Sequence, residues 1–140
     1  MEDGISTCTA EPLRILVAED EPSYAHLLSY ALRKGGHTGE RVADGEALLQ
    51  AVGKGRYDVL LIDLRMPRLG GVEAAAWIRR HHQDDDRPFL IAVTAESDAQ
   101  GAEWTRQHGF DAHFTKPIDA GALLAALARV PRRRPLPASV

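Results

Sequence analysis

Five side chains in the sequence have the types that phosphoryl chemistry needs. They are the carboxylates of Glu19, Asp20 and Asp63, the hydroxyl of Thr94 and the ammonium group of Lys116. If folding gathers the carboxylates, they repel one another, and burial raises their pKa values, so the group is unfavourable unless a cation neutralises it. A hard ion that takes oxygen ligands and keeps several waters suits such a group, and the lack of neighbouring Cys or His ligands argues against zinc. The sequence therefore predicts Mg²⁺ as the cofactor.

The hydroxyl and the ammonium group add a second requirement, because the storage of magnesium needs neither. Both groups bind anions, so they imply that an anion enters the acidic site. If Asp63 attacks a phosphorus atom, Lys116 offsets charge on the phosphoryl oxygens and Thr94 donates a hydrogen bond to one of them. The predicted product is an aspartyl phosphate at Asp63.

The elements that must position these residues follow from an alternating pattern. Short apolar runs alternate with segments of helical period, which is typical of a parallel sheet with crossover helices. Right-handed crossovers bring the carboxyl ends of all strands to one edge, where open α/β sheets bind ligands. The five reactive side chains lie at the ends of predicted strands, so we expect them to meet at this edge. The predicted strands cover residues 14–18, 38–42, 57–62, 88–93 and 112–115.

Helical periodicity predicts a helix after each strand, which makes five strands and five helices. The first helix ends at Gly35-Gly36, and Asp44 is expected to cap the second. The fourth helix, over residues 97–108, has a thin apolar face of Ala99 and Ala102, so we expect it to be loosely held. The apolar face of the first helix consists of Tyr24, Leu27, Leu28, Ala31 and Leu32.

Length and composition indicate one globular domain, because the chain has 140 residues, 44% of them hydrophobic. We expect this domain over residues 13–130, between a disordered leader (1–12) and a flexible Pro/Arg-rich tail (131–140). No run approaches the roughly 20 apolar residues that span a bilayer, so no membrane partner is expected. A net charge of −3 gives no long-range attraction to nucleic acid. The single cysteine, Cys8, cannot form an internal disulfide, which favours the reducing cytoplasm.

These features, in this order, resemble the receiver domain of two-component response regulators. The resemblance spans roughly residues 13–130, and residues 109–118 are also similar to receivers attached to hybrid sensor kinases. Any one pair of matching residues is weak evidence, but each group of them begins at the predicted end of a strand. The matching residues are Glu19-Asp20, Asp63 followed by Met66-Pro67 and Gly71, Thr94-Ala95, and Lys116-Pro117.

The resemblance implies a doubly wound, flavodoxin-like α/β fold with the strand order 2-1-3-4-5. It implies that Asp63 takes its phosphoryl group from a phosphohistidine and that Lys116 pairs with this group. It also implies that the bond between Lys116 and Pro117 is cis. The implied magnesium ligands are Asp20, Asp63 and the backbone carbonyl of Arg65, with Glu19 acting mainly through water.

One departure from the family concerns the switch residues. Where the family most often has Tyr or Phe, three residues before the lysine, this chain has His113, so the usual coupling of an aromatic rotamer to Thr94 does not carry over directly. Imidazole is smaller and can carry charge near neutral pH. The competing interpretation is a polar side chain at the end of a short strand. The resemblance places the output surface on the fourth helix, the fifth strand and the fifth helix, where Trp104 either covers the edge of the core or anchors a partner.

Three functions can be weighed on these residues. The first is a phosphorylation switch: a histidine kinase or a histidine phosphotransfer protein phosphorylates Asp63, and a downstream protein reads the result. The second is a non-phosphorylated receiver-like module that binds partners constitutively. The third, an aspartate-nucleophile phosphatase, would have a second acid two residues after the nucleophile, where Arg65 stands. The acidic group, Thr94 and Lys116 favour the first, with no separate small-molecule substrate and a monomer or weak homodimer.

Overall fold

The sheet of this protein has five parallel strands in the order β2-β1-β3-β4-β5. The structure is a computed structural model, and it describes residues 12–82, 87–95 and 102–131. The strand order confirms the predicted doubly wound α/β fold, whose switch point lies beside the first and third strands. The strands are β1 (Arg14–Ala18), β2 (Thr38–Val42), β3 (Val59–Asp63), β4 (Phe89–Thr94) and β5 (Ala112–Thr115).

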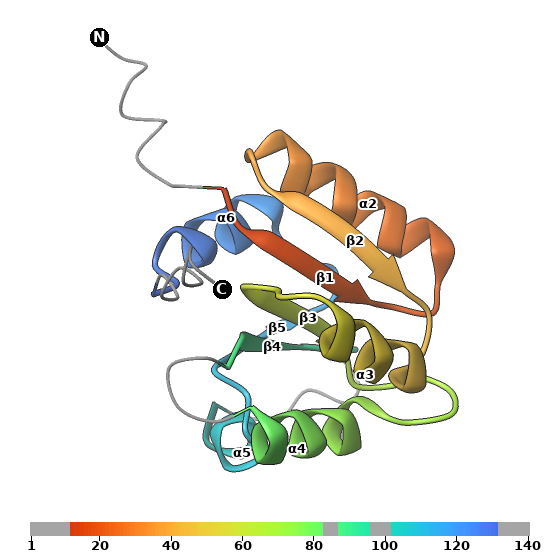
Figure 1. Cartoon of the computed structure of the whole chain (residues 1–140). Coiled ribbons are helices and arrows are strands. Elements are labelled where there is room, and N and C mark those ends of the chain that lie inside the picture. Colours follow the sequence, from red (N-terminus) through yellow and green to blue (C-terminus); the bar gives the residue numbers. More distant parts are fainter. Residues whose placement is uncertain (1–11, 83–86, 96–101, 132–140) are drawn as a thin grey trace, which may run out of the picture.

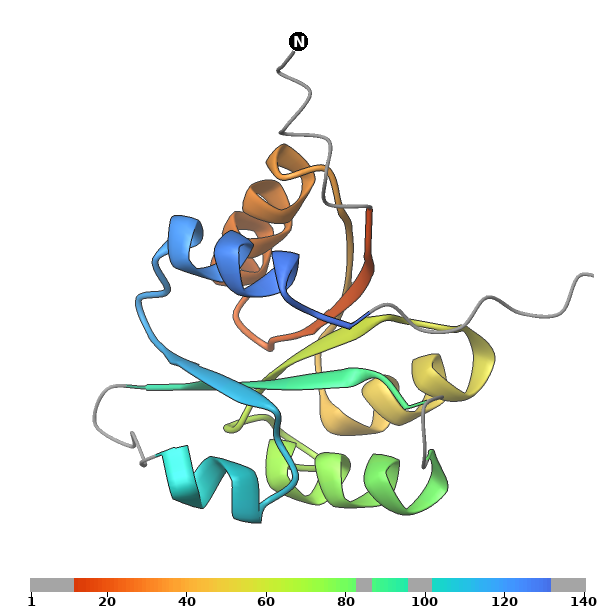
Figure 2. The same cartoon turned by 90° about the vertical axis from the view of Figure 1, so that its left-hand side faces the viewer.

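Five helices in the described part of the chain connect these strands and cover both faces of the sheet. Figures 1 and 2 show α2 and α6 on one face and α3, α4 and α5 on the other, so the sheet is the middle of three layers. The expected leader and tail lie almost entirely outside the described residues. The helices are α2 (Pro22–Lys34), α3 (Gly45–Lys54), α4 (Gly71–His81), α5 (Ala102–Gln107) and α6 (Ala120–Ala128).

The central strand β3 explains the most continuous apolar run of the sequence. All five of its residues are buried. Because successive side chains of a strand point to opposite faces, Leu60 and Ile62 join the core on the α3 and α4 side. Val59 and Leu61 join the core on the α2 and α6 side. The strand is one residue longer at its end than predicted, since Asp63 is still paired with Val93 of β4.

Side-chain caps fix where two helices begin. Glu21 caps α2 by accepting a hydrogen bond from the Tyr24 N–H at 2.8 Å, and Pro22 occupies the first turn, where a missing N–H costs nothing. The predicted cap of α3 is confirmed, because Asp44 Oδ1 accepts a hydrogen bond from the Ala47 N–H at 2.8 Å. The capping residue Glu21 immediately follows Glu19 and Asp20 in the chain, so it fixes the start of α2 next to these acidic residues.

The predicted apolar face of α2 is wrong at Leu27, whose side chain is 57% exposed. The buried residues of α2 are Ala25, Leu28, Ser29 and Leu32, which lie slightly around the helix from the predicted stripe. Gly39 of β2 lets this face approach, because a Cβ there would lie 3.2 Å from Leu32 and 3.4 Å from Ser29. The remaining part of the apolar stripe lines a groove of about 380 Å³ between α2 and α6.

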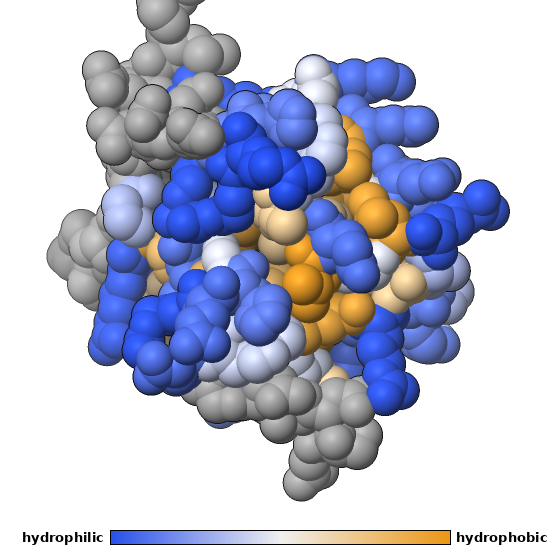
Figure 3. All heavy atoms as spheres, turned by 90° about the horizontal axis from the view of Figure 1, so that it is seen from below, coloured by the Kyte–Doolittle hydropathy of each residue, from blue (hydrophilic) through white to orange (hydrophobic). Residues whose placement is uncertain are grey.

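The fourth predicted helix is described only in part, as α5. Residues 96–101 and the side chain of Ala102 are outside the described residues, so the expected thin face of Ala99 and Ala102 remains a prediction. Thr105 is the buried member of α5, at 3% exposure. Figure 3 views the molecule from the α4 and α5 side and shows hydrophilic side chains surrounding an apolar area.

An ion pair at the opposite end of the sheet from the acidic residues supports the stability of β4 and β5. Asp111 accepts hydrogen bonds from Arg87 Nη1 at 2.8 Å and Nη2 at 2.7 Å, and a third from the Leu90 N–H at 2.8 Å. Both side chains are mostly buried. We expect Asp111→Ala to lower the free energy of unfolding by about 2 kcal/mol, because it leaves a guanidinium and a backbone donor without this acceptor. Urea denaturation measures this change.

A matched control for Asp111→Ala is Glu103→Ala. Glu103 also pairs with an arginine, Arg106, but the pair is highly exposed and its atoms are 3.9 Å apart. Exposed pairs of this kind contribute little, so we expect no measurable change in unfolding. Equal losses in the two variants would show that the buried pair has no special role.

Candidate functional site

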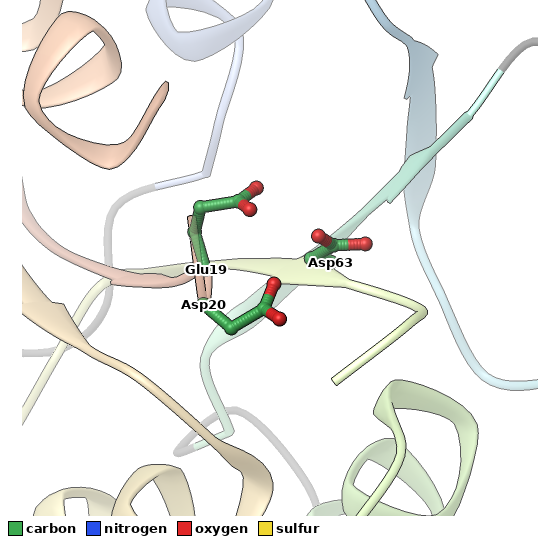
Figure 4. A group of neighbouring side chains, drawn as sticks. All are labelled: Glu19, Asp20 and Asp63. Atoms are coloured by element: carbon green, nitrogen blue, oxygen red, sulfur yellow. The ribbon is translucent and has the colours of Figure 1, made fainter. Parts of the chain in front are cut away.

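Three carboxylates meet at the carboxyl ends of β1 and β3. Glu19 and Asp20 directly follow β1, and Asp63 is the last residue of β3. One oxygen from each carboxylate lies within 4.8 Å of the others. Figure 4 shows the side chains of Glu19 and Asp20 extending to the side on which Asp63 lies. The structure therefore brings together the acids that the sequence predicts to meet.

Burial divides these acids. Glu19 is 1% exposed and Asp63 is 6% exposed, whereas Asp20 is open to solvent. Lys116 Nζ lies 3.0 Å from Glu19 Oε1 and 3.2 Å from Asp63 Oδ2. One ammonium group thus pairs with both buried carboxylates, and the site keeps a negative charge.

The pKa directions at the site reflect this imbalance. Burial raises the pKa of the Glu19 carboxyl, although hydrogen bonds from Lys116 and from the Glu21 N–H oppose the shift. Burial disfavours the charged form of Lys116, but hydrogen bonds and charges from Glu19 and Asp63 outweigh it and raise the pKa of the ammonium group. Lys116 is therefore held as a cation, and a further cation would relieve the remaining charge of the acids.

The backbone orients the carboxylate of Asp63. Its Oδ1 accepts a hydrogen bond from the Arg65 N–H at 3.0 Å, while its Oδ2 faces Lys116. Gly71 makes this loop possible, because a Cβ there would lie 2.7 Å from the Asp63 carbonyl oxygen and 2.8 Å from Leu64 Cα. Only glycine lets α4 begin so close to the end of β3.

Thr94 supplies an unused hydrogen-bonding group. It is the last residue of β4, is 3% exposed, and its Oγ1 has no hydrogen-bond partner among the described residues. A buried hydroxyl without a partner costs about 1–3 kcal/mol, so it is ready to bond an incoming acceptor. The Lys116 N–H donates to the Thr94 carbonyl at 2.8 Å, which ties the two predicted anion-binding residues together.

The loop after β5 holds a contact that the sequence analysis missed. The Lys116–Pro117 bond is cis, as the resemblance implies. Lys116 Nζ lies 4.7 Å from the ring centroid of Tyr24, and the Tyr24 hydroxyl accepts a hydrogen bond from the Ile118 N–H at 2.9 Å. The sequence marked Tyr24 only as part of an apolar stripe. Its position in the first turn of the helix that follows Asp20 is the one sequence signal that could have linked it to the site.

Two of the three predicted switch residues, His113 and Trp104, lie in β5 and α5. His113 is half-buried in β5; because Ala112 and Phe114 beside it pack on the α2 and α6 side, it faces the α4 and α5 side. Trp104 is half-buried in α5 and stacks on His108, with ring centroids 4.0 Å apart. Trp104 and His113 thus lie in two elements of the expected output surface, the fourth predicted helix and the fifth strand.

Known proteins show the same sequence pattern and architecture. The family model of the response regulator receiver domain matches residues 15–128. The chain belongs to the response regulator receiver domain family. This receiver is 39% identical over 129 residues to the transcriptional regulatory protein TcrA of Mycobacterium tuberculosis, a match that covers 89% of this chain and 48% of TcrA. It is 31% identical over 122 residues to the response regulator ArlR of Staphylococcus aureus, covering 87% of this chain and 54% of ArlR.

A solved receiver structure also resembles this receiver. It is the receiver domain of the sensor histidine kinase PA1611 from Pseudomonas aeruginosa, described with a magnesium ion coordinated in its active site cleft. The identity is 32%, the TM-score is 0.74, and the match covers 85% of this chain and 97% of that one. This receiver spans about half the length of TcrA and ArlR. Within its described residues, no helix is long and apolar enough to cross a bilayer.

Proposed function

We propose that this receiver is a phosphorylation switch in which Asp63 accepts a phosphoryl group from a phosphohistidine. The donor is a histidine kinase or a histidine phosphotransfer protein, and a downstream protein partner reads the result. The observation that carries this proposal is the unpartnered Thr94 hydroxyl at the end of β4. The neighbouring strand β3 ends in Asp63, whose carboxylate is already oriented by Lys116 and the Arg65 N–H. The cytoplasm is the compartment we assign, with the receiver as a monomer or weak homodimer.

The proposed transfer is an in-line displacement. An oxygen of Asp63 forms a bond to phosphorus while the bond from phosphorus to the donor imidazole nitrogen breaks, and the electron pair leaves with the imidazole. In this proposal Lys116 offsets charge on the transferred oxygens, and Thr94 donates a hydrogen bond to one of them. Lys116 already pairs with Asp63 before the donor arrives, and the Lys116 N–H bonds the carbonyl of Thr94.

The acidic residues fit a magnesium ion. Their oxygens lie within 4.8 Å of one another, all are hard donors, and the site has more carboxylates than cations. Asp20, Asp63 and the Arg65 carbonyl would hold the ion, with Glu19 acting mainly through water. When bound, the ion supplies positive charge that offsets the negative charge on the transferred oxygens. The ion described in the PA1611 receiver supports this assignment.

The alternative of a non-phosphorylated interaction module explains less of the site. It gives no reason to bury two carboxylates around one ammonium group, or to leave the Thr94 hydroxyl without a partner. No enzymatic activity beyond this receiver's own phosphorylation and dephosphorylation is part of the proposal.

Intact-mass measurement tests the proposed function. The full chain is incubated with phosphoramidate in the presence of Mg²⁺, and in parallel with a chelator. We expect one added phosphoryl group per chain with Mg²⁺ and almost none with the chelator. A wild-type chain that takes up no phosphoryl group would overturn the proposal.

The proposed output surface consists of α5, β5 and α6, and tryptophan emission reports on it. When Thr94 bonds a phosphoryl oxygen, the segment that follows it must adjust, which biases the population of α5 positions. We expect beryllofluoride with Mg²⁺ to change the emission of wild type and of Trp77→Phe, but much less that of Trp104→Phe.

The two tryptophans are matched probes for this experiment. Trp77 of α4 stacks on His81 with centroids 3.8 Å apart, much as Trp104 stacks on His108. The Nδ1 atom of each histidine also lies within hydrogen-bond distance of the backbone carbonyl of the tryptophan on which it stacks. A change carried entirely by Trp77 would therefore move the responding surface to α4.

A further inference from the structure

Tyr24 contacts the phosphorylation site from outside the group of acids. It lies in the first turns of α2 and is half-buried. The Lys116 ammonium group lies 4.7 Å from its ring centroid, within the range of a cation–π interaction. Its hydroxyl accepts the Ile118 N–H at 2.9 Å. Tyr24 thus touches the loop after β5 at two points, one of them the cation of the site.

The position of the ring is fixed from the acidic side as well. The Tyr24 N–H donates to Glu21 Oε1 at 2.8 Å, and the Glu21 N–H donates to Glu19 Oε2 at 3.1 Å. A continuous set of contacts therefore runs from Glu19 through the cap of α2 to Tyr24, and from Tyr24 to Lys116. Lys116 closes the ring of contacts by pairing with Glu19 at 3.0 Å.

We propose that the aromatic ring of Tyr24 positions Lys116 for phosphoryl transfer, an inference that rests on the proposed function. A lysine side chain is a compact charge on a flexible four-carbon stem, so its placement needs a support. A third carboxylate in the place of this ring would form another ion pair with the ammonium group, and it would compete with Asp63 for that group. A neutral ring attracts it without a hydrogen bond, so the ammonium group stays near Asp63 and can still turn toward a phosphoryl oxygen.

Three variants separate the ring from the hydroxyl and from general packing. Tyr24→Phe keeps the ring and removes the hydroxyl that bonds Ile118, whereas Tyr24→Leu removes both. Tyr30→Leu is the control, since Tyr30 is on the same helix and lines the same groove but has no contact with Lys116 among those described. Melting temperatures are measured for all three, so that a loss of folding is recognised.

The rate constant of phosphoryl uptake from phosphoramidate with Mg²⁺ is the first readout. We expect Tyr24→Leu to lower it about fivefold, with Tyr24→Phe and Tyr30→Leu within about twofold of wild type. The inference is overturned if Tyr24→Leu keeps the wild-type rate, or if Tyr24→Phe loses as much as Tyr24→Leu. A wild type that takes up phosphoryl groups while all variants match it rejects only this inference, whereas a wild type that takes up none rejects the proposed function.

A second readout does not depend on turnover. The ring current of Tyr24 shifts the NMR signals of the Lys116 side-chain ε-protons upfield if the ammonium group lies over the ring. We expect this upfield shift in wild type and Tyr24→Phe, its loss in Tyr24→Leu, and its reduction when beryllofluoride with Mg²⁺ draws Lys116 away. Identical Lys116 shifts in wild type and Tyr24→Leu would show that the ring does not hold the lysine.

Discussion

Replacing Asp63 with asparagine is expected to abolish phosphoryl uptake from phosphoramidate, to the level of the background in an intact-mass spectrum. Asparagine keeps the shape of the side chain and can still accept the Arg65 N–H, which holds Asp63 Oδ1 at 3.0 Å. It lacks the second anionic oxygen, the one that faces Lys116 at 3.2 Å, and so has no nucleophile. The fold should survive, because the substitution also removes one of the mutually repelling charges.

The matched control for Asp63→Asn is Asp58→Asn, just before the other end of β3. Asp58 Oδ2 accepts the Arg14 N–H at 2.8 Å, and an amide oxygen can replace it. We expect Asp58→Asn to take up one phosphoryl group at the wild-type rate. Uptake by Asp63→Asn as complete as in wild type would move the acceptor to another residue, and peptide mapping would then identify it.

We expect Mg²⁺ to raise the melting temperature of this receiver by a large amount. The ion binds only the folded arrangement of the three acids, so it stabilises by linkage. At a free concentration about 100 times Kd, the gain is about 2.7 kcal/mol, or roughly 10 °C for a domain of this size. Differential scanning calorimetry with Mg²⁺ and with a chelator measures the increment.

The increment should nearly vanish in Asp20→Ala. Asp20 is the exposed member of the group and is free of the Lys116 ion pair, so it is the acid most available to a metal. Its removal also relieves repulsion, so the metal-free variant should be at least as stable as wild type. Glu103→Ala, which removes an exposed acid of α5, should keep the full increment. An unchanged response in Asp20→Ala would place the ion elsewhere.

The gathering of the reactive residues could be predicted because it depends on topology alone. Any parallel sheet with right-handed crossovers brings the ends of β1, β3, β4 and β5 to one edge, so side chains at those ends must meet. The order of the strands came from the resemblance, since hydrophobic patterns do not reveal which strands are neighbours. The chemistry expected of Glu19, Asp63 and Lys116 could thus be predicted from their residue types and from their positions at the ends of strands.

Side-chain environments could not be predicted in the same way. Glu19 and Asp20 are adjacent and chemically alike, yet one is buried against Lys116 and the other faces solvent. Which of two neighbouring residues turns inward depends on the packing of the following helix. Leu27 illustrates the same point, because a helical stripe can be wider than the face that a neighbouring layer covers. Tyr24 was missed because its partner lies far away in the sequence.

Lys116 follows the last strand of the sheet, so it joins the acidic site late when the chain is synthesised. Lys116 is 53 residues beyond Asp63, with which it pairs. A ribosome-bound chain that ends before β5 holds the buried carboxylates of β1 and β3 without their ammonium partner, and the outer edge of β4 is unpaired. Partial neutralisation of the buried acids and protection of the β4 edge therefore arrive together, with the segment that contains β5 and Lys116. We therefore expect nascent chains to complete the sheet and the acidic site only after β5 and Lys116 have emerged.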